Sequence, residues 1–161
     1  VQVAHLRRVV GRLVERDVRQ VGVADGDVET VAHEAHVNAD GPQFVQVHAL
    51  FSDLYTAAEG KVDPVAEYIS LLGGAAKISN VELIKSSMKP RLPQGLPVST
   101  DGLALCAAMF ALVQKFGALI EPLIVELGSK DLVAQNMLID VWSSVAVPGW
   151  KIGKMLQGGV K

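Results

Sequence analysis

Cysteine and aromatic residues are scarce in this sequence, and both shortages narrow the choice of fold. The single cysteine, Cys106, cannot close a disulfide within the chain, and it lies in an apolar run where a thiol normally packs as a small hydrophobic side chain. Aromatic residues make up only 5% of the chain, whereas alanine, valine and leucine recur with few strand-like alternations. This composition predicts an all-α fold whose helices pack through small side chains.

Neither sign of charge is in large excess, because the sequence has 15 lysines and arginines and 17 acidic residues. The chain as a whole therefore has no strong attraction for nucleic acid or anionic lipid. Residues 1–8 carry charge early and no long apolar stretch follows, so a secretory signal is not predicted. The apolar region 102–127 is interrupted by Gln114, Lys115 and Glu121, and we expect no membrane span. A cytoplasmic protein is the expectation, with nucleoid association if it binds DNA.

The positions of glycine and proline divide the chain into helices. With 161 residues, half of them hydrophobic, the chain predicts one domain over residues 1–161. Breaks at Gly41-Pro42, at Gly73-Gly74, between residues 89 and 97 and at Gly128 leave room for four long helices. Their expected ranges are His5–Val37, Pro42–Leu72, Thr100–Leu127 and Ser129–Leu156.

Several local features qualify these ranges. Pro42 suits the first position of a helix, and Ser99 and Thr100 offer caps for the third helix. Residues 74–84 predict a crossover with a short extra helix. Three prolines fall inside predicted helices, so either those helices bend there or the boundaries are misplaced; they are Pro64, Pro122 and Pro148.

Most of the candidate metal ligands lie between residues 35 and 74. His48 and Ser52 are four residues apart, as are Asp63 and Glu67, so each pair shares one helix face. His48 and Asp63 are 15 residues apart, which is roughly 22 Å along a straight helix. One copy of the helix cannot bring both to one ion, but two antiparallel copies related by a twofold axis can. Imidazole and carboxylate together suit Fe(II), and zinc would compete for the same donors.

The same segment resembles the signature of the Dps family, the mini-ferritins that protect DNA in starved cells. The family pattern is a His-Trp-Asn run, Gly-x-x-Phe, a histidine, a carboxylate four residues later, Asp-x-x-x-Glu and Leu-Gly-Gly. Its spacing is matched without a gap by His36-Val37-Asn38, Gly41-Pro42-Gln43-Phe44, His48, Ser52, Asp63, Glu67 and Leu72-Gly73-Gly74. Two positions depart from it, since Val37 replaces the tryptophan and Ser52 replaces the carboxylate.

This resemblance implies a ferritin-like four-helix bundle that assembles into a dodecameric cage. Iron would be oxidised, with hydrogen peroxide as the oxidant, at sites between twofold-related subunits. His36 and His48 would come from one subunit, and Asp63 and Glu67 from its partner. Asp131 and Asp140 approximate positions at which the family lines a threefold pore, where Asn136 replaces one acid.

Two further hypotheses stay open. The cage could have lost ferroxidase activity through Ser52 and act in DNA binding or structure, using a basic stripe formed by Arg7, Arg8, Arg12, Arg16 and Arg19. The chain could instead be an unrelated helical bundle whose histidines match by chance. His33 is expected to support the site rather than to bind metal, and Asp53 to be a surface residue.

Overall fold

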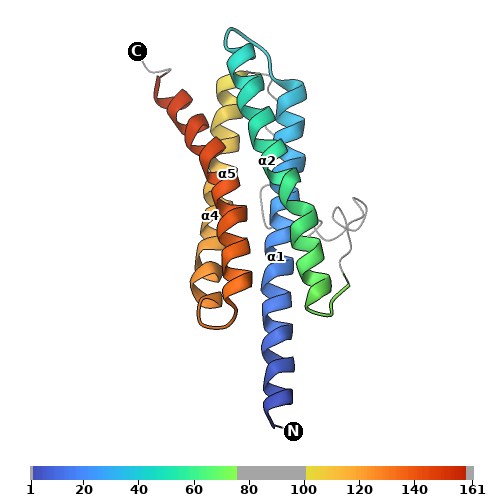
Figure 1. Cartoon of the computed structure of the whole chain (residues 1–161). Coiled ribbons are helices and arrows are strands. Elements are labelled where there is room, and N and C mark those ends of the chain that lie inside the picture. Colours follow the sequence, from blue (N-terminus) through green and yellow to red (C-terminus); the bar gives the residue numbers. More distant parts are fainter. Residues whose placement is uncertain (1, 76–100, 159–161) are drawn as a thin grey trace.

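The computed structural model describes residues 2–75 and 101–158, and the side chains within them except those of 2–10 and 23. Four α-helices account for almost all of this part of the chain, and no strand occurs in it. With the labels of Figure 1, they are α1 (Gln2–Asn38), α2 (Phe44–Leu71), α4 (Gly102–Leu127) and α5 (Leu132–Gly158). The all-α prediction is confirmed. The short extra helix predicted in the crossover lies outside the described residues.

The helices form two hairpins that pack side by side. The contact between α1 and α2 is the most extensive, followed by that between α4 and α5, and α2 against α5 joins the hairpins. Figure 1 shows that α2 and α4 run in the same direction, so the end of α2 and the start of α4 lie at opposite ends of the bundle. The N-terminal turns of α1 extend beyond the ends of the other helices.

The core is built from apolar residues spaced three or four apart along each helix, which places them on one helix face. On α1 these are small, including Val14, Val18, Val21 and Val28, whereas Phe51 of α2 and Phe116 of α4 are the largest fully buried side chains among the described residues. By length and composition α4 could cross a membrane, but much of its apolar surface is buried in the bundle. Burial raises the pKa of the Cys106 thiol to about 11, as expected for a core cysteine.

The helix starts are set by residues that the sequence analysis partly missed. Gly41 has a φ of +97°, and the chain reverses there, so α2 begins at Phe44 and Pro42 lies in the turn rather than in the helix. The N-cap of α4 is Asp101, whose carboxylate accepts from the Leu103 amide at 3.1 Å. Ser99 and Thr100, the predicted caps, lie outside the described residues.

The start of α5 also differs from the prediction. Asp131 accepts from the amides of Val133 and Ala134 at 2.9 and 3.0 Å, so the helix begins at Leu132 instead of Ser129. The Ser129 hydroxyl donates to the carbonyl of Glu126 instead and caps nothing in α5. All three internal prolines do lie inside helices: Pro64 in α2, Pro122 in α4 and Pro148 in α5.

Close packing between α4 and α5 depends on glycine at position 149. A Cβ atom there would meet Val113 Cγ1 at 2.5 Å. We expect Gly149→Ala to lower the free energy of unfolding by about 1–3 kcal/mol, because the core cannot expand locally without strain. Gly60→Ala is the control, because nothing lies within 4 Å of its added methyl group and alanine favours the helix. Denaturant unfolding should show that the free energy of unfolding falls in Gly149→Ala and rises in Gly60→Ala.

Candidate metal centre

His36 and His48 face each other across the turn between α1 and α2. Their rings stack with centroids 3.7 Å apart and planes inclined by 26°. The Nδ1–H of His36 donates to the main-chain carbonyl of His48 at 3.0 Å, and the Nδ1–H of His48 donates to that of His36 at 2.9 Å. The sequence-predicted pair of imidazoles is therefore brought together within one chain.

These two hydrogen bonds fix the chemistry of the rings. A carbonyl oxygen can only accept, so each neutral imidazole must carry its proton on Nδ1. The Nε2 lone pair of each ring is then left for a metal ion. The carbonyl of His36 needs a donor because it belongs to the last turn of α1, which ends at Asn38 and leaves its final carbonyls without helical partners. The His48 ring supplies that donor.

Other rings hold the imidazoles in place. Tyr55 meets His36 edge-on at 5.2 Å and stacks on His33 at 4.5 Å, while Phe44 lies 4.9 Å from His48. The sequence analysis predicted a supporting role for His33 and named Phe44 as part of the family pattern, but it overlooked Tyr55. A signal for Tyr55 was present, because it follows His48 by seven residues and so lies two turns along the same face of α2.

Asp63 and Glu67 lie exposed near the far end of α2, one turn apart. Neither His36 nor His48 belongs to one group with Asp63 or Glu67. The described residues contain no group of three or more His, Cys, Asp and Glu side chains that could hold a metal ion. A single chain thus supplies two separate half-sites on one helix, with imidazoles at its start and acids towards its end.

Among the described residues, no carboxylate joins the two imidazoles in a group that could hold a metal ion, so none takes the place of the one missing at position 52. Ser52 is half-buried one turn after His48. Asp53 is directed to the other hairpin, where it accepts from Lys151 Nζ of α5 at 2.8 Å. The expected surface role of Asp53 is borne out.

The acids considered for a pore are engaged within the chain. Asp131 caps α5 and accepts from the Tyr68 hydroxyl at 2.9 Å. Burial and this carboxylate together raise the pKa of Tyr68 to about 12, so the phenol remains a donor at neutral pH. Asp140 accepts from Lys61 Nζ of α2 at 2.7 Å.

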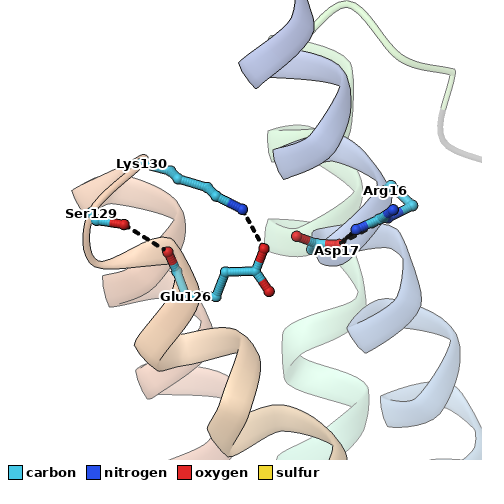
Figure 2. Close-up of polar contacts among 5 residues, drawn as sticks. All are labelled: Arg16, Asp17, Glu126, Ser129 and Lys130. Atoms are coloured by element: carbon cyan, nitrogen blue, oxygen red, sulfur yellow. Dashed lines mark hydrogen bonds and ion pairs between the residues drawn. The ribbon is translucent and has the colours of Figure 1, made fainter.

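Much of the described basic stripe is also paired within the chain. Figure 2 shows Arg16 beside the neighbouring Asp17, to which its Nε and Nη2 atoms donate at 3.0 and 2.8 Å. Arg19 donates to Glu15 and to the carbonyl of Ala75.

A further ion pair lies outside this stripe. At the end of α4, Lys130 pairs with Glu126 and lowers the pKa of the Glu126 carboxyl.

Comparisons with known proteins agree with this architecture. The Ferritin-like domain family model matches residues 27–157. The DNA protection during starvation protein of Brevibacillus brevis is 42% identical over 43 residues, which are 27% of this chain and 29% of that protein. The protein of the same name from Agrobacterium fabrum is 30% identical over 91 residues, 56% of this chain and 52% of that one. The chain thus spans about half or less of the length of these two relatives.

Solved structures show the same fold. Dps92 from Deinococcus radiodurans superposes with a TM-score of 0.83 at 19% identity, over 92% of this chain and 88% of that one. Dps from Mycobacterium smegmatis does so with a TM-score of 0.80 at 24% identity, over 90% and 87%. The chain belongs to the ferritin-like family. Within it, the named relatives and structural neighbours are those of the Dps, or mini-ferritin, group, which confirms the resemblance found in residues 36–74.

Proposed function

We propose that this single-domain chain assembles into a dodecameric cage that oxidises and stores iron, with sites formed between twofold-related subunits. His36 and His48 of one subunit bind Fe(II) through their Nε2 atoms. The partner subunit's Asp63 and Glu67 complete the coordination and offset the charge of the ion. Hydrogen peroxide accepts one electron from each of two Fe(II) ions, its O–O bond breaks, and two protons are taken up to form two waters.

The observation that carries this proposal is the reciprocal bonding of the two histidines. It orients both rings before any metal arrives and reserves one nitrogen on each, an arrangement that second-sphere hydrogen bonds produce in metal sites. The carboxylate oxygens of Asp63 and Glu67 complement these nitrogens as ligands for a first-row ion. Zinc would bind the same donors without redox chemistry.

Exposed apolar residues support the intersubunit location. Val37, Phe44 and Val45 expose 65%, 41% and 73% of their surface beside the imidazoles, and Leu71 exposes 77% one turn beyond Glu67. Both half-sites are therefore flanked by apolar surface that an isolated chain would leave in water. Antiparallel packing of two α2 helices would cover this surface and bring the imidazoles of one copy to the acids of the other.

Solution size and metal-soaked crystals test the proposal. Twelve chains of 17.1 kDa should elute near 200 kDa. Crystals soaked in ferrous salt should give an anomalous iron peak between His36, His48 and the partner subunit's carboxylates. A monomer in solution, or an empty interface after soaking, would refute the proposal.

Tyr55 is expected to support metal binding through its contact with His36. We expect Tyr55→Leu to weaken Fe(II) binding about tenfold, since loss of an orienting contact next to a ligand costs roughly 10- to 100-fold in affinity. Tyr55→Phe keeps the ring and should bind as the wild type does. Anaerobic Fe(II) titration measures both. Equal affinity in all three proteins would show that Tyr55 does not position the imidazole.

A cage that has lost ferroxidase activity and binds DNA is the second candidate, favoured by the extension of α1 beyond the bundle. The Brevibacillus brevis and Agrobacterium fabrum relatives are named for DNA protection. Arg12 is exposed on this helix. On this account, a salt-sensitive shift of DNA mobility should fade when Arg8 and Arg12 are neutralised. Absence of a shift at low salt would exclude this second candidate.

For both candidates we propose a cytoplasmic location, with association with the nucleoid if DNA is bound.

A further inference from the structure

A carboxyl group without a partner lies in the middle of the bundle. Asp25 of α1 is 0% exposed, and neither of its carboxylate oxygens has a hydrogen-bond partner among the described residues. It sits on the core stripe of the helix, between Val21 and Val28. An ionised carboxylate in such a place is costly unless it is neutralised or paired.

The lysine that acts on Asp25 electrostatically is bonded to another carboxylate. Gly22 of α1 packs against Val65 of α2, with a built Cβ only 2.8 Å from Val65 Cγ1. Because the two helices are antiparallel, Asp25 comes level with the residues three to four before Val65, which are Lys61 and Val62. Lys61 acts on Asp25 electrostatically, yet its Nζ atom is bonded to Asp140 of α5 at 2.7 Å.

The surroundings favour the protonated form of Asp25. Burial raises its pKa well above the ordinary range; Lys61 lowers it in part, and Glu29, one turn along α1, raises it. On α5, Asp140 is bonded to Lys61. The buried residues of α4 and α5 are apolar, glycine, proline or cysteine. Among the described residues, Lys61 is therefore the one cation found to act on the Asp25 carboxyl.

We propose that Lys61 exchanges between two carboxylate partners. While Asp25 of α1 is protonated, Lys61 pairs with Asp140 of α5. When Asp25 loses its proton, the Lys61 ammonium group moves to the Asp25 carboxylate. Lys61 stays charged throughout, and the proton leaves to solvent. The exchange transfers one ion pair from the α2–α5 contact to the α2–α1 contact and releases the Asp140 carboxylate at the surface.

The direction of the pH dependence follows from linkage. A carboxyl whose pKa is raised on folding binds a proton more tightly in the folded state, so its contribution is fully present below the unfolded pKa and is lost as the pH rises through the folded pKa. Pairing with Lys61 limits that loss at high pH. Lys61 should therefore matter more to stability in alkaline than in acidic solution.

Crystal structures of the full chain at about pH 5 and about pH 9 test the exchange directly. These two pH values lie on either side of neutrality, and both are above the ordinary pKa range of aspartate. We expect Lys61 Nζ within hydrogen-bonding distance of Asp140 at the lower pH and of Asp25 at the higher. In Asp25→Asn it should stay on Asp140 at both. The proposal is overturned if Lys61 keeps the same partner at both pH values in the wild type, or moves equally in Asp25→Asn.

Thermal unfolding gives an independent measurement in solution. Lys61→Met should lower the midpoint more at about pH 9 than at about pH 5, by a margin of about 4 °C or more. In an Asp25→Asn background the effect of Lys61→Met should be the same at both pH values. A pH-independent effect of Lys61→Met in the wild-type background would contradict the exchange.

Discussion

Replacing His36 and His48 together by alanine is expected to slow the rapid phase of Fe(II) oxidation by peroxide at least about 100-fold. Loss of a single orienting neighbour of a ligand already costs roughly 10- to 100-fold, and here both nitrogen ligands disappear. Stopped-flow absorbance after mixing Fe(II)-loaded protein with peroxide measures the rate. His33→Ala is the matched control, because the His33 ring contacts Tyr55 and His36 but is not itself a proposed metal ligand, and most of the activity should remain.

The double variant also removes two side-chain to main-chain hydrogen bonds at the turn between α1 and α2. Oligomer size and helix content must therefore be measured in the same samples. A wild-type rate no faster than that in buffer, or a double variant with an intact rapid phase in a folded cage, would contradict the assignment of these residues.

Restoring a carboxylate at position 52 is expected to strengthen iron binding. Ser52 is half-buried one turn after His48, so an aspartate there lies on the same face of α2 as the imidazole. We expect Ser52→Asp to bind Fe(II) about tenfold more tightly, which corresponds to about 1.4 kcal/mol, and to oxidise it faster. Isothermal titration under anaerobic conditions measures the affinity.

Ser52→Asn is the control for this gain, because it has the size of aspartate without its charge. The asparagine variant should bind as the wild type does. If aspartate and asparagine give the same affinity, the side chain at position 52 does not reach the metal, and the departure from the Dps pattern at this position has no bearing on activity.

The helices were predictable because their core residues recur every three or four positions and because glycine and proline mark their ends. The caps were harder. Asp101 and Asp131 compete with nearby serine and threonine residues for the same role, and which side chain reaches the free amides depends on the local turn. Asp25 occupies a core position of α1, but an aspartate is normally solvated, so its burial became evident only from the packing.

For the candidate site, sequence spacing identified the residues but not their arrangement. His36 and His48 come together because the Gly41 turn lies midway between them, and their mutual bonds depend on that geometry. Likewise the ion pair of Asp53 with Lys151 joins residues 98 positions apart, which no local pattern reveals. The placement of Asp63 and Glu67 against the imidazoles of another subunit stays a prediction.

Mixed cages test that placement most directly. Subunits with His36→Ala and His48→Ala are co-assembled in equal amounts with subunits carrying Asp63→Ala and Glu67→Ala, each variant alone being inactive. If imidazoles and acids come from different chains, half of the twofold pairs are mixed and each mixed pair regains one of its two sites, so about a quarter of the wild-type iron-oxidising sites should return. Mixed cages of normal size with no activity above that of the separate variants would contradict a shared site.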